Sequence, residues 1–243
     1  MSPDATPILN VTKLVKRFGG FRALDGLSFH VTSGEILGLV GPNGSGKTTA
    51  INIISGLYPP DGGEVIFDGV SIGGRASHRI VHDGINRTFQ VPKPFLSLTV
   101  RENVRVALAY GRASVTPPKV EELLEEYHLT AVADRPAADL NSAQQKMLDL
   151  TRALATRPQL LLLDELAAGL NPTELDWIGG RIKALAATGM AIIVVEHLMG
   201  FIEQITDRVI VLNAGKEIFG GKLAAAVREP EVIEVFLGGE HVA

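Results

Sequence analysis

One short stretch constrains this chain more than any other. Residues 41–48 read Gly-Pro-Asn-Gly-Ser-Gly-Lys-Thr and fit the phosphate-binding loop pattern G-x-x-x-x-G-K-S/T at every fixed position. An apolar run over 36–40 precedes the loop, and residues 49–55 after it read as a helix. This order of strand, loop and helix separates a phosphate loop from an ordinary glycine-rich turn. The sequence therefore predicts the P-loop unit of an α/β protein.

The residue types in this loop indicate how it would bind phosphate. Glycines allow backbone N–H groups to close around a phosphate, and the N-terminus of the following helix adds partial positive charge. Lys47 would reach the β- and γ-phosphates, and Thr48 would ligate Mg²⁺. The expected nucleotide-binding residues here are Gly41, Pro42, Asn43, Gly44, Ser45, Gly46, Lys47, Thr48 and Thr49.

Composition limits the functions that remain open. The formal net charge of −4 argues against broad, sequence-independent binding of nucleic acid, so we expect no nucleic-acid partner. The chain has no cysteine, which excludes disulfides, zinc–thiolate sites and thiol catalysis. The first residues lack the pattern of a signal peptide, and no apolar stretch reaches the length of a membrane span. We therefore expect a cytoplasmic protein that would reach a membrane only by docking to another protein.

Short alternating strands surround the P-loop unit in the sequence. Residues 8–15 and 27–31 alternate between apolar and polar, with Gly19 and Gly20 in the turn region between them. Residues 65–67 read as another strand, followed by a turn. This pattern predicts a small, partly antiparallel sheet wrapped around the P-loop unit.

Continuous apolar runs mark the strands of the core. The runs at 160–163 and 192–195 are typical of strands that are covered on both faces of a parallel sheet. Further strands are expected over 85–89, closing at Gln90, and over 208–212. These runs place the phosphate loop in an α/β core.

A helical segment interrupts the strand pattern. Over about 92–157 the sequence is punctuated by prolines and looks helical, and helices are expected over 100–109, 120–127 and 142–156. We interpret this segment as a helical subdomain inserted into the α/β core. A short terminal helix is expected over 231–237, and residues 1–243 would form one domain.

Two acids follow one of the buried core strands. Asp164 and Glu165 come directly after the apolar run at 160–163. In phosphate-loop proteins an acid at this place lies beside the bound Mg²⁺, so Asp164 would hold the ion through water. Glu165, one residue later, would polarise the attacking water as a general base. The alternative is two solvated acids at a strand end, and the phosphate loop upstream argues against it.

Three single residues are candidates for the same site, and each has an alternative. His197 follows the strand at 192–195 and would contact the γ-phosphate and orient the water; otherwise it is a loop histidine. The amide oxygen of Gln90 would reach Mg²⁺ and water; otherwise Gln90 is a turn residue. Phe18 precedes the turn at 19–20, where an exposed ring would stack on a purine base, although local sequence favours a core phenylalanine.

The order of these motifs resembles the nucleotide-binding subunit of an ATP-binding cassette (ABC) transporter over nearly the whole chain. By this resemblance Phe18 stacks on adenine, residues 41–48 are the Walker A loop and Gln90 begins the Q-loop. The other family motifs fall on residues 160–164 (Walker B), Glu165 (the catalytic glutamate) and His197 (the switch histidine).

The family signature is altered in this chain. Where it usually reads Leu-Ser-Gly-Gly-Gln, residues 140–144 read Leu-Asn-Ser-Ala-Gln. In the family this segment begins a helix whose N-terminus faces the γ-phosphate of ATP bound to the opposite subunit. Cβ atoms at the two glycine positions would hinder close approach to that phosphate, and Ser142 with Gln145 also fits a capping box. The resemblance implies contacts to nucleotide from Asn141, which would replace the serine hydroxyl, and from Ser142, Ala143 and Gln144.

Three segments narrow the resemblance to one type of importer. Residues 86–90, 167–172 and 231–238 look like those of the ATPases of branched-chain amino acid importers, although urea and amide importers share them. The resemblance implies membrane permease subunits, a second ATPase subunit, identical or different, and a solute-binding protein as an indirect partner. It also implies a peripheral place on the inner face of the cell membrane. Residues 91–97 would dock to the permease; otherwise they form a plain proline-containing loop.

The sequence thus predicts an α/β P-loop NTPase with an antiparallel β subdomain and a helical subdomain. It would bind ATP and Mg²⁺ between two subunits and hydrolyse ATP. The expected catalytic residues are Glu165, His197 and Lys47, and the expected metal ligands are Thr48, Gln90 and Asp164.

Two other classes stay open. The altered signature favours a degenerate subunit that binds ATP but hydrolyses it slowly, whereas Glu165 and His197 argue against it. The other class is an ABC ATPase that acts on DNA or ribosomes. Such proteins usually carry a long coiled coil or two tandem cassettes, and this chain has neither.

Overall fold

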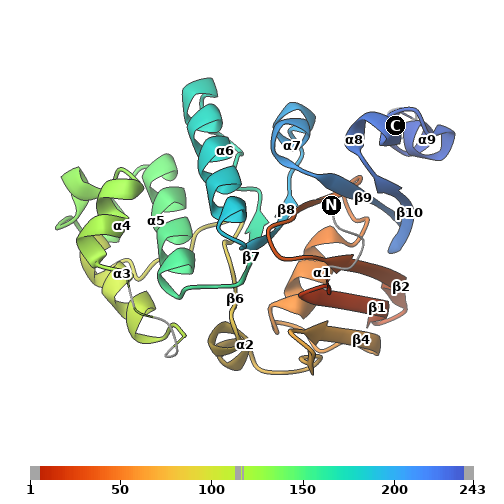
Figure 1. The fold of residues 1–243 in the computed structure, drawn as a ribbon, viewed down its shortest axis with the longest axis horizontal. Coiled ribbons are helices and arrows are strands. Elements are labelled where there is room, and N and C mark those ends of the chain that lie inside the picture. The colour runs from red at the N-terminus through yellow and green to blue at the C-terminus, as the bar shows by residue number, and fades with distance from the viewer. Residues whose placement is uncertain (1–5, 113–115, 117, 238–243) are drawn as a thin grey trace.

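A six-stranded sheet forms the centre of the molecule (Figure 1). The computed structural model describes residues 6–112, 116 and 118–237. The strand order is β10-β9-β3-β8-β7-β6, with β10 antiparallel to β9 and the other neighbours parallel. The phosphate loop therefore follows a central strand, β3, of a mainly parallel sheet. The bounds are β3 (Ile36–Val40), β6 (Ile85–Arg87), β7 (Leu160–Asp164), β8 (Ala191–Val195), β9 (Arg208–Asn213) and β10 (Lys216–Gly221).

A smaller antiparallel sheet covers one side of this core. Its order is β2-β1-β4-β5, which confirms the predicted antiparallel β subdomain. The turn at 19–20 joins β1 to β2, and both strands are longer than expected because pairing continues through register shifts as far as Phe18 and Phe21. The bounds are β1 (Leu9–Phe18), β2 (Phe21–Val31), β4 (Gly62–Phe67) and β5 (Val70–Ser71).

The first helix after the phosphate loop, α1 (Lys47–Ile54), lies between the two sheets. Its buried residues share one apolar cluster with both sheets. Leu160 and Leu162 of β7 belong to this cluster, whereas Leu161 and Leu163 belong to the cluster on the opposite face. Alternate residues of a strand point to opposite faces. Burial on both faces therefore explains the continuous apolar run at 160–163.

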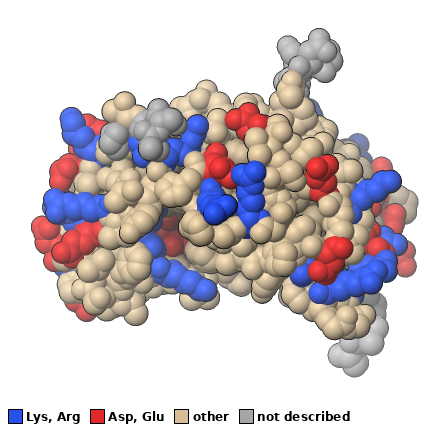
Figure 2. Space-filling model, turned by 90° about the horizontal axis from the view of Figure 1, so that it is seen from below, with Lys and Arg blue, Asp and Glu red and all other residues tan. Residues whose placement is uncertain are grey.

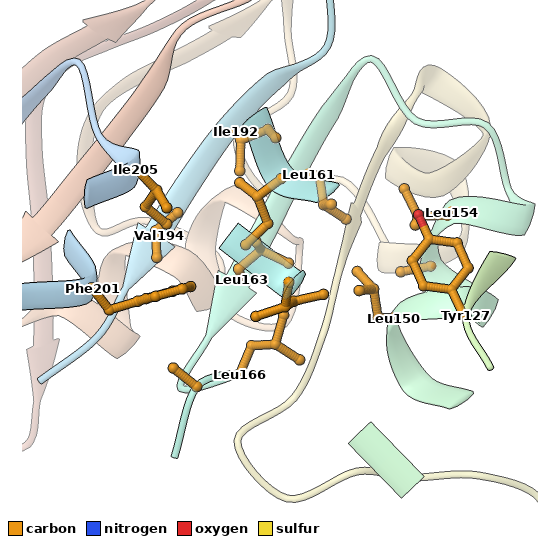
Figure 3. Close-up of a cluster of buried hydrophobic side chains, with 14 of the residues drawn as sticks. Tyr127, Leu150, Leu154, Leu161, Leu163, Leu166, Ile192, Val194, Phe201 and Ile205 are labelled. Carbon is orange, nitrogen blue, oxygen red and sulfur yellow. The ribbon is translucent and has the colours of Figure 1, made fainter. Parts of the chain in front are cut away.

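Helices cover the second face of the core sheet. They are α5 (Ser142–Ala155), α6 (Pro172–Ala187) and α7 (Met199–Ile205). Figure 3 shows this layer, in which leucines, an isoleucine and a valine of β7 and β8 lie among side chains from the helices. The labelled residues are Tyr127, Leu150, Leu154, Leu161, Leu163, Leu166, Ile192, Val194, Phe201 and Ile205. α6 and α7 were not predicted from the sequence.

The predicted helical segment lies at one end of the molecule, and the antiparallel sheet lies at the other (Figure 1). Between β6 and β7 the chain forms α3 (Val100–Ala109), α4 (Val120–Glu126) and α5. α3 packs against α5, and Thr99 begins α3 through a capping box with Glu102. The shorter helices are α2 (Ser77–Asp83), η1 (Thr130–Val132), η2 (Ala137–Asp139), α8 (Leu223–Ala226) and the expected terminal helix α9 (Pro230–Leu237).

Two local predictions are wrong. β6 ends at Arg87, so Gln90 does not close a strand; the backbone N–H of Phe89 instead donates to Asp149 Oδ2 of α5 at 2.8 Å. The capping box of α5 lies one residue earlier than Ser142. Asn141 Oδ1 accepts from Gln144 N at 2.8 Å, and Gln144 Oε1 accepts from Asn141 N at 3.2 Å. Asparagine in this place leaves Ser142 inside the helix.

The surface carries charges of both signs. Figure 2 shows one face, on which Lys and Arg lie interspersed with Asp and Glu. The described part of this face therefore has no uniform field of one sign. Within residues 6–112 and 118–237, every helix falls short of the length and apolar content that a bilayer crossing needs.

Candidate active site

A cavity of about 490 Å³ lies beside the phosphate loop. Its lining comes from the loop and the start of α1, the β1–β2 hairpin, the segment after β6, and the ends of β7 and β8. Most residues that the sequence assigned to one site therefore meet around one space. The lining residues are Phe18, Phe21, Ala23, Asn43, Gly44, Ser45, Gly46, Lys47, Thr48, Thr49, Gln90, Glu165 and His197.

Glycine is required at two positions of the phosphate loop. Gly41 has φ 147°, and a Cβ there would lie 2.2 Å from the carbonyl oxygen of Leu212 in β9. Gly46 has φ 109°, and its Cβ would lie 2.7 Å from the carbonyl oxygen of Ala23 in β2. Both contacts are to backbone, so any side chain would displace the loop. The loop thus packs closely against both sheets, and the N-terminus of α1 begins at the cavity.

Lys47 lies folded across its own loop. Its Nζ donates to the carbonyl oxygens of Gly41 and Pro42, both at 2.8 Å, and to Ser45 Oγ at 3.4 Å. Burial lowers the pKa of Lys47, and the nearby charges of Glu165 and Asp164 oppose that shift. The ammonium group is therefore already inside the loop that would surround a phosphate.

Glu165 lies between two other polar side chains of the cavity. Gln90 Nε2 donates to Glu165 Oε2 at 2.8 Å, and His197 Nε2 lies 3.1 Å from Glu165 Oε1. The three residues meet because β6, β7 and β8 are parallel neighbours whose carboxyl ends share one edge of the sheet. With its amide nitrogen on Glu165, Gln90 keeps its amide oxygen for another partner.

Asp164 is buried behind this group and paired with an arginine that sequence reasoning missed. Arg87 Nη2 lies 2.9 Å from Asp164 Oδ2, and the two side chains are only 7% and 2% exposed. Arg87 Nη1 also donates to Asn52 Oδ1 of α1 and to Oγ of Ser55, the residue directly after α1. Burial raises the pKa of Asp164, while the charge of Arg87 opposes the shift. Arg87 belongs to residues 86–90, a segment that resembles an importer motif. Its pairing with Asp164 was not predicted because the two residues lie 77 positions apart in the sequence.

One wall of the cavity is aromatic. Phe18 is 44% exposed at the end of β1, so the core position that its local sequence favours is wrong. Its ring meets Tyr58 edge-on, with centroids 5.4 Å apart, and Lys16 Nζ lies 5.6 Å from the centroid of Phe18. Phe21, across the hairpin, is also exposed and lines the same space. Exposed rings here offer a flat apolar surface to a planar base.

The donor set suits Mg²⁺ bound together with phosphate. The described residues contain no group of three or more His, Cys, Asp or Glu that would bind a metal by themselves. Mg²⁺ usually takes one or two carboxylates and completes its shell with water and substrate phosphate oxygens. Asp164 would supply one carboxylate, with Oδ2 on Arg87, and Thr48 and Gln90, which line the cavity, would supply neutral oxygens. The residues present therefore fit the expected ion.

The altered signature lies outside this cavity. Asn141, Ala143 and Gln144 line a second cavity of about 260 Å³, together with Trp177 of α6, and Ser142 is exposed. Within one chain, these residues and the phosphate loop line different cavities. The resemblance implies this separation, because the signature segment would face nucleotide bound to an opposite subunit. Asn141 Oδ1 is already used in the cap of α5. It would have to leave the cap to replace a serine hydroxyl toward phosphate.

Two further buried charges near Glu165 were not predicted. Lys146 of α5 is 8% exposed, and Glu196 at the end of β8 is 2% exposed. Burial raises the pKa of Glu196 to about 7, although the Ala167 N–H and the charge of Lys146 lower it. The only signal in the sequence is the position of Glu196 directly before His197.

Comparison with known proteins identifies relatives of this chain. The family model for ABC transporters matches residues 24–168. The chain is 36% identical to the high-affinity branched-chain amino acid transport ATP-binding protein BraF of Pseudomonas aeruginosa, over 96% of this chain and 98% of BraF. It is 34% identical to the corresponding protein LivG of Escherichia coli, over 96% of this chain and 98% of LivG.

Solved structures with the same fold include two informative cassettes. An ATP-binding cassette of an ABC transporter in its ADP conformation has a TM-score of 0.84 and 32% identity, covering 96% of this chain and 99% of that one. A dimeric cassette in a post-hydrolysis state with ADP and phosphate has a TM-score of 0.80 and 26% identity, covering 88% and 98%. These similarities confirm the predicted P-loop fold class.

Proposed function

The chain belongs to the ABC transporter family, and we propose that it is the ATP-hydrolysing subunit of an importer for branched-chain amino acids or a related amide or urea solute. The observation that carries the mechanism is the meeting of Glu165, Gln90 and His197 at the cavity of the phosphate loop. The names of the relatives support the solute class, since BraF and LivG are branched-chain amino acid transport proteins.

ATP would bind along the cavity from the aromatic wall to the phosphate loop. Phe18 would stack on the adenine ring, and the amides of residues 41–49 with the N-terminus of α1 would bind the phosphates. Lys47 would exchange its contacts with the loop carbonyls for the β- and γ-phosphates. A phosphate oxygen is a stronger partner than a neutral carbonyl for an ammonium group, which favours this exchange.

The side chains around Glu165 suit in-line attack of water on the γ-phosphate. Glu165 would take the proton of the attacking water as general base. His197, 3.1 Å from one carboxylate oxygen, would orient that carboxylate and contact the γ-phosphate. Mg²⁺, when bound by Thr48, Gln90 and Asp164, would neutralise charge on the phosphates. Lys47 would stabilise the charge that develops on the transferred group.

A second cassette would complete the site. Asn141, Ser142, Ala143 and Gln144 lie at the start of α5, exposed or half-buried, and so they are available to an opposite subunit. The dimeric cassette among the similar structures supports this arrangement. We propose that each signature segment contacts ATP bound to the other subunit, in a homodimer or a heterodimer.

The permease would dock on the segment that follows Gln90. Val91, Phe95 and Leu96 are 71%, 48% and 56% exposed, which is unusual for apolar side chains so close together. The buried Asn103 of α3 fixes this segment, because Oδ1 accepts from Phe95 N and Nδ2 donates to the carbonyl oxygen of Phe95. The position next to Gln90 would transmit changes at the nucleotide to the permease. Binding there would place the subunit on the inner face of the membrane, with a solute-binding protein as an indirect partner.

Two experiments test this proposal. Lys47→Ala should abolish tight ATP binding without unfolding the chain, as followed by equilibrium titration and far-UV circular dichroism. Lys183→Ala, at an exposed lysine of α6, is the matched control. Unchanged affinity in a folded Lys47→Ala variant would refute the phosphate-loop assignment. For the solute, cells that lack this chain should lose uptake of labelled leucine; loss of urea or amide uptake alone would move the assignment to the related class.

A further inference from the structure

The loop that follows β7 is bound by two ionisable side chains from other parts of the fold. Lys146 Nζ, from α5, donates to the backbone carbonyl oxygens of Glu165 at 3.0 Å, Leu166 at 3.2 Å, and Ala168. Glu196 Oε1, from the end of β8, accepts from the backbone N–H of Ala167 at 2.7 Å. Four backbone polar groups, the carbonyls of residues 165, 166 and 168 and the N–H of residue 167, are thus bound from outside the loop.

Among the described residues, the hydrogen bonds of the Lys146 ammonium group all go to this loop, and Glu196 interacts with the N–H of Ala167 and of His197. An ammonium group has three donors, and Lys146 directs bonds to three carbonyl oxygens while it is 8% exposed. Burying charge is costly unless the group is well bonded. Leu166 and Ala167 of the loop are themselves buried, so these bonds fix a segment that lies inside the fold directly after Glu165.

We propose that Lys146 and Glu196 are positioning residues that fix the backbone of Glu165 so that its carboxylate faces the γ-phosphate region of the cavity. The proposal rests on the proposed role of Glu165 as general base. Neither residue lines the cavity, so both act through Glu165 and not on the nucleotide.

The conformation of Glu165 explains why such positioning is needed. Its φ is 52°, in the left-handed region that residues other than glycine seldom adopt. Such a conformation persists only where the surroundings over-determine it. Here the N–H of Glu165 donates to the carbonyl oxygen of Val195 at 2.9 Å, and its carbonyl accepts from Lys146 at 3.0 Å. Without Lys146, the peptide after Glu165 can rotate and carry the carboxylate away from Gln90 and His197.

The same contacts connect the catalytic loop to the signature helix. Lys146 stands two residues beyond Gln144 in α5, the helix that begins with the altered signature. A helix moves largely as a rigid body over so few residues. Seating of the signature segment on nucleotide in the opposite subunit would therefore also place Glu165 for hydrolysis in its own subunit.

The test is a comparison of Lys146→Met and Lys146→Arg in single-turnover ATP hydrolysis. Lys146→Met removes all three donors and should slow hydrolysis about 10- to 100-fold, because small displacements of a catalytic group have effects of this size. The Kd for ATP should change by less than about twofold, since Lys146 does not line the cavity. Lys146→Arg keeps donors and should recover most of the rate. Lys183→Met, at an exposed lysine of α6, is the matched control and should leave the rate unchanged.

A double-mutant cycle separates positioning from a general loss of structure. In the Glu165→Gln background no general base remains to be positioned, so Lys146→Met should alter the residual rate by less than about twofold. Equal slowing in both backgrounds, or an unchanged rate in Lys146→Met, would overturn the inference. If Glu165→Gln alone leaves hydrolysis fast, the proposed function of Glu165 has failed, which is a separate outcome.

Three further variants keep the inference falsifiable if Lys146→Met does not fold. Lys146→Gln keeps a shorter, neutral group with two N–H donors and should give an intermediate rate at unchanged ATP affinity. Glu196→Ala removes the acceptor for Ala167 N and should slow hydrolysis, whereas Glu196→Gln keeps an acceptor oxygen and should retain most of the rate. A fully active Glu196→Ala variant would remove Glu196 from the proposal.

Discussion

Glu196 should make the stability of the fold depend on pH. Its side chain is 2% exposed at the end of β8, and burial raises its pKa from an ordinary 4.5 to about 7. The N–H groups of Ala167 and His197 and the charge of Lys146 oppose this shift, while the charge of Glu165 adds to it. Between pH 4.5 and about pH 7, Glu196 is therefore mainly protonated in the folded chain and mainly ionised in the unfolded chain.

The size of the effect follows from the shift. One pKa unit corresponds to about 1.4 kcal/mol, so a rise from 4.5 to about 7 corresponds to about 3 kcal/mol. A folded pKa above the unfolded one contributes stability that is fully present below 4.5 and is lost as the pH rises to about 7. Between pH 5 and pH 8 we expect the loss to be about 2.5 kcal/mol.

Glu196→Gln isolates this contribution, because glutamine keeps the acceptor for Ala167 N and does not ionise. The free energies of unfolding of both proteins are measured by urea titration at pH 5, 6, 7 and 8, with Trp177 fluorescence and far-UV circular dichroism. The difference between wild type and Glu196→Gln should shift by about 2.5 kcal/mol against wild type as the pH rises. Glu203→Gln, at an exposed glutamate of α7, is the control and should show a constant difference. A constant difference for Glu196→Gln would refute the reasoning.

Three other variants test separate parts of the account. Arg87→Met should lower the free energy of unfolding by about 3–5 kcal/mol, because it leaves Asp164 buried without its partner; a loss below about 1 kcal/mol in urea titration would contradict this. Gly41→Ala should weaken ATP binding at least about tenfold in equilibrium titration, since its Cβ would lie 2.2 Å from Leu212 O, and normal affinity would show that the loop adapts. Replacing Asn141, Ser142 and Ala143 by Ser, Gly and Gly should strengthen ATP-driven dimerisation about tenfold in sedimentation of the Glu165→Gln protein, as contacts to phosphate shorten. Unchanged or weaker association would show that the altered signature works as it stands.

The features that the sequence predicts well are those encoded by neighbouring residues. The phosphate loop depends on glycines at fixed spacing, and Gly41 and Gly46 occupy positions where a Cβ would meet backbone. The strands at 160–163 and 192–195 are recognisable because burial on both faces requires a continuous apolar run. Asp164 and Glu165 come directly after the first of these runs, and one residue separates His197 from the second, so the strand prediction also located them.

The features that the sequence does not reveal depend on contacts between distant segments. Arg87 meets Asp164 only because β6 pairs with β7, and Lys146 meets the Glu165 loop only because α5 packs on the core sheet. β6 ends before Phe89 because the backbone N–H of Phe89 donates to the carboxylate of Asp149, which lies on α5. Phe18 is exposed because the β1–β2 pairing carries it to the tip of the hairpin, which the local apolar pattern does not show.

The rate of a single turnover of ATP by the Glu165→Gln variant tests the central claim most directly. Glutamine keeps the shape of the side chain but cannot accept the proton of the attacking water. Hydrolysis should therefore slow by about 10²–10⁴, while ATP binding is retained and the ATP-bound dimer becomes easier to trap. The exposed Glu203→Gln variant should hydrolyse ATP at the rate of wild type. A Glu165→Gln rate within about a factor of two of wild type would show that another residue activates the water and would contradict the account.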